Sequence, residues 1–92
     1  MQKKLCKHFI IHGRVQGVFF RACAQDEAKK LSLTGWTRNL PEGTVEILAC
    51  GNEEELALFA EWLNHGPSGA KVDKVDTKQH DWQEFDRFYI KG

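Results

Sequence analysis

Residues 13–21, GRVQGVFFR, combine two glycines and two arginines with no acidic side chain. Gly13 and Gly17 permit left-handed backbone conformations, and successive N–H groups in such a loop can converge on an anion. Arg21 falls where a helix is predicted to begin, and the positive end of a helix dipole disfavours a cation. An anion bound between the guanidinium and the helix N–H groups removes that conflict. The segment therefore predicts a cradle for a phosphate or carboxylate group.

A plainer interpretation of the same segment stays open at this stage. Arg21 could be a solvated surface residue, with the glycines serving only to turn the chain. The segment is not a Walker A loop, because no Lys-Ser/Thr pair follows the second glycine. It also lacks the third glycine of the dinucleotide-binding fingerprint.

The elements that would position this loop alternate between strand and helix patterns. Residues 5–12 are rich in β-branched and aromatic side chains and predict a strand. Residues 20–32 predict a helix with one apolar face, formed by Phe20, Ala24, Ala28 and Leu31. Residues 36–40 and 44–50 flank the turn LPEG and predict a hairpin.

The second half of the chain predicts another helix and further strands. Asn52 followed by Glu55 is a helix-start signal, and residues 65–67 end that helix. Its expected buried face comprises Leu56, Phe59, Ala60 and Leu63. Residues 70–79 predict a strand with a bulge, and residues 85–91 a last strand with Phe88 and Ile90 in the core.

This order predicts an α+β fold of the ferredoxin-like type (βαββαβ). In it, two helices cover one face of an antiparallel sheet and make a two-layer sandwich. A length of 92 residues and a hydrophobic content of 41% predict a single folded domain over residues 1–92.

Thirteen basic residues balance thirteen acidic ones, so the chain lacks the basic excess typical of proteins that bind nucleic acids or anionic membranes. The N-terminal segment MQKKLCKHF has no apolar region like that of a signal peptide. No stretch approaches the ~18 apolar residues of a membrane span. We expect a cytoplasmic protein that binds neither nucleic acid nor membrane.

The cysteines and histidines do not predict a metal site. Three cysteines without CxxC spacing argue against zinc and against a secreted disulfide framework. His8 and His12 would lie about 13 Å apart along a strand, too far to share one ion. His65 and His80 have no visible partner. We expect neither a metal nor a cofactor.

Residues 11–21, IHGRVQGVFFR, resemble the signature of the acylphosphatases, in which G-R-V-Q-G-V-x-F-R forms the phosphate cradle. A second stretch is similar too: Gly35-Trp36-Thr37-Arg38-Asn39, then Gly43-Thr44-Val45, then Gly51. The resemblance extends over essentially the whole chain. Thr37 departs from the family pattern, which usually has a small apolar residue there, and Phe19 occupies a variable position.

The resemblance implies an enzyme that hydrolyses the carboxyl–phosphate bond of small acyl phosphates. Arg21 would hold the phosphoryl group, and Asn39 would orient the attacking water. The backbone N–H groups of the loop would complete the cradle, through Val15, Gln16, Gly17, Val18, Phe19 and Phe20. The implied enzyme needs no metal or cofactor, and its cradle would also accept phosphate or sulfate. The oligomeric state stays open, with a monomer as the default expectation. Arg14 is expected to face solvent or the acyl tail of the substrate.

Two other functions stay open. The same fold serves RNA-binding domains, in which sheet-face aromatics stack on bases, and Phe9 and Tyr89 are the candidates here. A regulatory domain could keep the cradle and bind a phosphorylated or carboxylated ligand without turnover. Asn39 is the feature that favours turnover.

The expected topology bears on the cysteines. The first strand and the strand after the hairpin turn would lie side by side and antiparallel, so Cys6 and Cys50 could be neighbours. A disulfide between them is one hypothesis, and free thiols in a reducing cytosol are the alternative. Cys23, on the first helix, is expected to be a buried small apolar residue.

Overall fold

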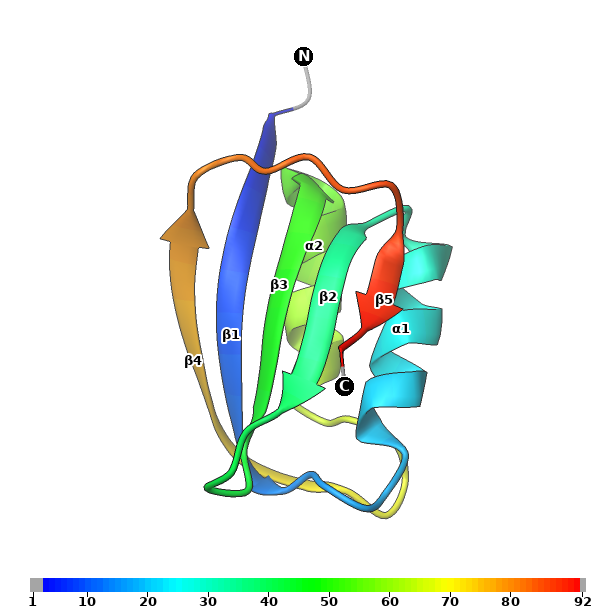
Figure 1. Ribbon diagram of the computed structural model, residues 1–92, viewed down its shortest axis with the longest axis vertical. Helices are drawn as coiled ribbons and strands as arrows, with labels where there is room; N and C mark the ends of the chain where they lie inside the picture. Colours follow the sequence, from blue (N-terminus) through cyan, green and yellow to red (C-terminus); the bar gives the residue numbers. More distant parts are fainter. Residues whose placement is uncertain (1–2, 92) are drawn as a thin grey trace.

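Both helices lie on one face of a five-stranded sheet in the computed structural model, which describes residues 3–91 (Figure 1). In chain order the elements are β1 (Lys4–Arg14), α1 (Phe20–Lys30), β2 (Thr34–Asn39), β3 (Val45–Asn52), α2 (Glu53–Leu63), β4 (Lys71–His80) and β5 (Phe88–Ile90). The strands are ordered β4-β1-β3-β2-β5 across the sheet. The predicted ferredoxin-like α+β fold is confirmed.

The last strand adds one feature to the βαββαβ pattern. The four longer strands pair antiparallel, whereas β5 pairs parallel with β2 at the edge of the sheet. The sheet is therefore mixed rather than purely antiparallel. The predicted strand over residues 85–91 shortens to three residues, because the chain reaches β2 only at Phe88.

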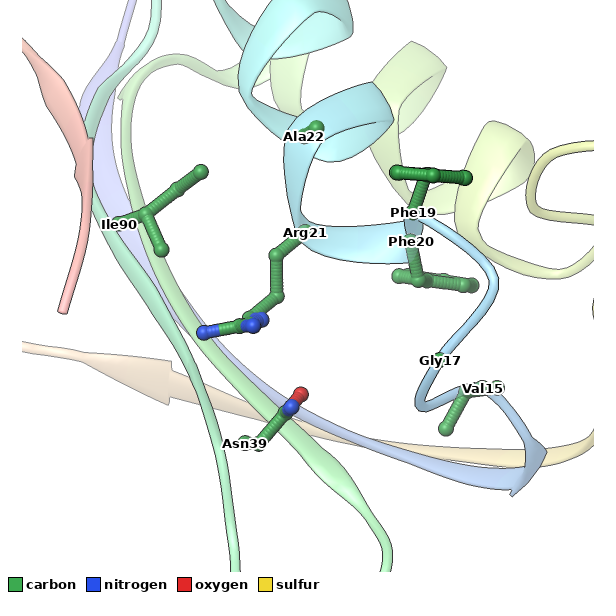
Figure 2. A pocket seen from close by; sticks show the side chains of 8 residues that line it. All are labelled: Val15, Gly17, Phe19, Phe20, Arg21, Ala22, Asn39 and Ile90. Carbon is green, nitrogen blue, oxygen red and sulfur yellow. The ribbon is translucent and has the colours of Figure 1, made fainter. Parts of the chain in front are cut away.

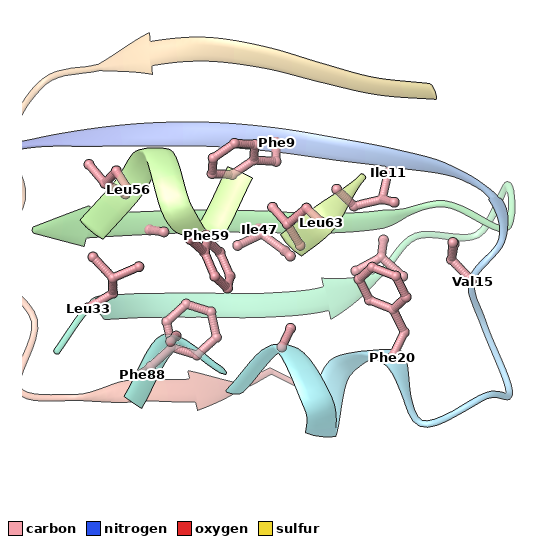
Figure 3. Close-up of a cluster of buried hydrophobic side chains, with 14 of the residues drawn as sticks. Phe9, Ile11, Val15, Phe20, Leu33, Ile47, Leu56, Phe59, Leu63 and Phe88 are labelled. Carbon is pink, nitrogen blue, oxygen red and sulfur yellow. The ribbon is translucent and has the colours of Figure 1, made fainter. Parts of the chain in front are cut away.

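The core lies between the sheet and the apolar faces of the two helices (Figure 3). Phe20, Ala24 and Ala28 of α1 are buried, as are Leu56, Phe59 and Leu63 of α2, in agreement with the predicted spacing. The Phe59 ring is central, with its centroid 6.0 Å from that of Phe9 and 6.1 Å from that of Phe88. Neither of these helices is long and apolar enough to cross a membrane.

Ile90 and Cys23 differ from their predicted burial. Ile90 was expected in the core but is 38% exposed, because it ends the short edge strand beside the first turn of α1. Cys23 is half-buried on the flank of α1 rather than fully enclosed.

A bulge lies in β4 opposite the end of β1. The pairing of β1 with β4 shifts between His12 and Gly13, because β4 carries the extra residue Asp73 there. The backbones approach so closely that a Cβ on Gly13 would lie 2.1 Å from the Lys71 carbonyl oxygen. Glycine is therefore required at the entrance to the loop, and the bulge predicted for residues 70–79 is confirmed.

A disulfide links the two central strands. Cys6 and Cys50 face each other in the β1–β3 register, with their Cα atoms 4.0 Å apart, and they are bonded. The bond lies on the sheet face opposite the helices, in a small cluster with Leu48, Trp36 and Phe85. It closes a loop of 44 residues, for which chain entropy gives a stabilisation of about 4 kcal/mol.

Candidate active site

The antiparallel register brings the loop after β1 and the end of β2 to the same end of the sheet. Val45, which begins β3, pairs with Ile11 near the end of β1 and with Asn39 at the end of β2. The chain leaves β1 into the loop of residues 15–19 and turns from β2 into the hairpin at this end (Figure 1). Two motifs that are distant in the sequence therefore meet in space.

A cavity of about 280 Å³ opens between this loop, the start of α1 and the ends of β2 and β5 (Figure 2). Six of the predicted site residues line it, namely Val15, Gly17, Phe19, Phe20, Arg21 and Asn39. Ala22 and Ile90 complete the lining. Gln16 and Val18 are not part of the lining.

Apolar side chains anchor the loop to the core. Val15 and Phe20 are each 1% exposed, and Val18 packs partly against the same core (Figure 3). The Phe20 ring lies against Trp62 of α2, with the two centroids 5.7 Å apart. Gly17 stays exposed with a left-handed φ of 76°, which glycine adopts without strain. These contacts anchor the loop to the core at the wall of the cavity.

Gln16 ties the loop to the hairpin. Its side-chain Nε2 donates to the carbonyl oxygens of Leu40 and Thr44, each at 2.8 Å. Leu40 directly follows Asn39, so these two bonds fix the cradle loop relative to the residue expected to hold water. Both amide hydrogens are used, which makes the side chain a positioning group. The sequence favoured a loop-shaping, hydrogen-bonding role for Gln16 but did not identify its partners, since they become neighbours only in the folded sheet.

The first turn of α1 is open toward the cavity. Phe19 is the N-cap residue, in a left-handed conformation, and its side chain makes no capping hydrogen bond. No acidic residue stands in the first turn, and Arg21 forms no salt bridge among residues 3–91. The positive charge of the guanidinium and that of the helix terminus are therefore both uncompensated at one place. That combination suits an anion.

Asn39 contributes an unpaired acceptor. Its Oδ1 is buried and has no hydrogen-bond partner within the described chain. Figure 2 shows the side chain of Asn39 pointing toward the guanidinium of Arg21. A buried acceptor without a partner costs about 1–3 kcal/mol, so its retention here favours a functional role.

Thr37, the departure from the family pattern, lies beneath the site. It is fully buried, and its hydroxyl has no hydrogen-bond partner within residues 3–91. The hydroxyl therefore adds a polar group to the core without a compensating bond. The side chain does not line the cavity.

The open face of the sheet carries a charge network beside the disulfide. Glu46 accepts hydrogen bonds from His8, at 2.8 Å, and from Arg38. Burial raises the pKa of the Glu46 carboxyl, but the bonds from His8 and Arg38 outweigh it and hold the pKa below its ordinary value of 4.5. His12 bonds in the same way to Asp76, at 2.9 Å. His8 and His12, which were weighed above as a pair of metal ligands, are therefore each hydrogen-bonded to a carboxylate.

Comparison with known proteins decides the family. The acylphosphatase family model matches residues 7–90. The chain belongs to the acylphosphatase family. It is 46% identical over 90 residues to an acylphosphatase of Legionella pneumophila strain Lens, covering 98% of this chain and 99% of that protein. The resemblance seen in the two motifs is thereby confirmed, and hydrolysis of acyl phosphates is the general activity of this enzyme.

Solved structures of the same family share the fold. An acylphosphatase from Coxiella burnetii superposes with a TM-score of 0.93 at 38% identity, covering 96% of this chain and 93% of that chain. The acylphosphatase from Bacillus subtilis also gives 0.93, at 39% identity, covering 96% of this chain and 99% of that chain.

The charge network of this acylphosphatase-family protein predicts a pH dependence of stability. Because the pKa of Glu46 is lowered on folding, its ionised form stabilises the protein above pH 4.5, and this contribution is lost as the pH falls through the lowered value. At pH 7 the free energy of unfolding of wild type should exceed that of Glu46→Gln, and this difference should be smaller at about pH 3. Urea unfolding at both pH values measures it; a constant difference would contradict the assignment.

Gln16→Ala tests the tie between the loop and the hairpin. Loss of two hydrogen bonds should lower the free energy of unfolding by about 1–2 kcal/mol and weaken the binding of inorganic phosphate roughly tenfold, because the loop loses its fixed position. Gln25→Ala is the matched control, since Gln25 donates one bond to the Phe88 carbonyl away from the loop. It should lower stability while leaving the phosphate Kd within about twofold. Equal phosphate affinity in wild type and Gln16→Ala would show that the tie is only structural.

Proposed function

We propose that this enzyme hydrolyses acyl phosphates by binding the phosphoryl group between Arg21 and the loop of residues 15–20, with Asn39 orienting the attacking water. The observation that carries the proposal is that Arg21, without an ion-pair partner among residues 3–91, and Asn39, whose buried Oδ1 lacks a hydrogen-bond partner there, line one cavity. The expected cradle residues Val15, Gly17, Phe19 and Phe20 line the same space.

The reaction needs little covalent work from the protein. The water oxygen forms a bond to phosphorus while the bond from phosphorus to the acyl oxygen breaks, and the products are a carboxylate and inorganic phosphate. Phosphoryl transfer of this kind depends on positioning and charge stabilisation. The guanidinium fork and the helix N–H groups supply the charge that the phosphoryl oxygens require.

The proton transfers follow from the groups at hand. A carboxylate is a good leaving group, so no general acid is required. Asn39 does not titrate and holds the water through its side-chain amide, while a phosphoryl oxygen of the substrate takes the proton of the water. We propose that the reaction proceeds without a metal, since Arg21 and the loop N–H groups provide the positive charge.

The alternative of RNA binding loses one of its two candidate side chains. Phe9 is fully buried on the helix side of the sheet, within the core, so it is not available for stacking. Tyr89 is partly buried and packs against Phe85, with centroids 6.3 Å apart. A non-catalytic domain that binds a phosphorylated ligand shares the cradle, and turnover separates it from the proposal.

Benzoyl phosphate hydrolysis in the presence of EDTA tests the proposal. Arg21→Ala and Asn39→Ala should each lower kcat/KM by about 10²–10³, the usual loss when one preorganised stabilising group is removed. Arg14→Ala removes the same charge from an exposed position outside the cavity and should stay within a few-fold of wild type.

Three results would contradict parts of the proposal. No turnover by wild type, with phosphate still bound, would favour the binding domain. Loss of wild-type activity in EDTA that returns with a divalent cation would show a metal requirement. Full activity of Asn39→Ala would leave the enzyme but remove the role of Asn39 in holding water.

A further inference from the structure

Two exposed apolar side chains stand at the mouth of the cavity. Within residues 3–91 four large apolar side chains are exposed, namely Phe19, Leu58, Trp82 and Ile90. Phe19, at 82% exposed, and Ile90, at 38%, line the same cavity. They come from opposite walls, since Phe19 precedes α1 and Ile90 ends β5. In Figure 2 Arg21 lies between them, and its guanidinium points toward Asn39.

The backbone at Phe19 makes its side chain an unexpected choice. With φ 61° and ψ 24°, the residue is in the left-handed region, which glycine and asparagine occupy more readily than an aromatic residue. The loop needs this conformation to enter α1, but it does not need a phenyl ring. The neighbouring Phe20 is 1% exposed and already anchors the loop to the core. The Phe19 ring is therefore not required for the backbone conformation, and it does not pack in the core.

We propose that Phe19 and Ile90 form an apolar rim that binds the acyl group of the substrate and selects uncharged aromatic or branched acyl phosphates. The inference rests on the proposed function, which fixes the phosphoryl group at Arg21. The acyl group then extends from Arg21 toward the mouth, between the two side chains. Apart from Arg21, no charged side chain lines the cavity within the described residues, and Val15, Phe20 and Ala22 add apolar surface.

The chemistry of the rim favours an aromatic acyl group in particular. A benzoyl ring can pack against the Phe19 ring and is removed from water by Ile90 on the other side. An acetyl group offers these two side chains much less apolar surface. A carboxylated or ammonium-bearing acyl chain would lose hydration there without gaining a partner. Selectivity should therefore appear as the ratio of kcat/KM for benzoyl phosphate to that for acetyl phosphate.

Phe19→Gly tests the rim, because glycine keeps the left-handed backbone while removing the ring. The benzoyl-to-acetyl ratio of kcat/KM should fall roughly tenfold, the discrimination typical of one lost apolar contact of this size. Ile90→Thr should lower the same ratio roughly threefold. Leu58→Ala, which removes an exposed apolar side chain on α2, is the matched control and should leave the ratio at the wild-type value.

Binding of phosphonate analogues, in which CH2 replaces the bridging oxygen, tests the rim without turnover. Relative to inorganic phosphate measured on the same variant, phenacylphosphonate should bind Phe19→Gly about tenfold more weakly than wild type, and acetonylphosphonate should change little. Equal losses for both phosphonates and both substrates would overturn the proposal and assign Phe19 to loop geometry alone. If wild type hydrolysed neither substrate, the proposed function would fail, and the phosphonate pair would still support or reject the rim.

Discussion

The antiparallel register of β1, β3 and β2 is the constraint on which the site depends. Val45 pairs with Ile11 on one side and with Asn39 on the other, so β1 and β2 both end at the same end of the sheet. A shift of one residue in the β2–β3 pairing would turn Asn39 to the opposite face, away from α1. The register is held by the burial of alternate side chains on the helix face, and the Cys6–Cys50 disulfide locks the β1–β3 pair.

Upon this frame the chain places three locally unfavourable features together. Arg21 lies at the positive end of a helix, Phe19 has a left-handed backbone, and the buried Asn39 Oδ1 lacks a partner within residues 3–91. Each has a cost in isolation, and the surrounding contacts of Val15, Phe20 and Gln16 hold them in place. Unfavourable features that gather at one cavity are typical of a functional site, because an anion and a water satisfy them when bound.

The features predicted correctly were those encoded by local patterns. Helical spacing predicted the buried faces of both helices and placed Arg21 at a helix start. The role of Gln16 depends on carbonyl groups of the hairpin that approach it only after the sheet has formed. Ile90 was predicted in the core because it shares a strand face with Phe88. Ile90 lies beside the first turn of α1, however, where the cavity opens and the helix does not cover the strand. Sequence periodicity shows which side chains share a face of a strand, but it does not show how much of that face a helix covers.

The binding of inorganic phosphate, followed by amide chemical shifts, tests most directly where the phosphoryl group is held. The anion should shift the backbone resonances of residues 15–21, the side-chain Nε–H of Arg21 and the side-chain amide of Asn39, and those shifts should be absent in Arg21→Ala. Shifts confined to the basic side chains on the open face of the sheet, around Lys74 and Lys78, or shifts that persist unchanged in Arg21→Ala, would contradict the cradle.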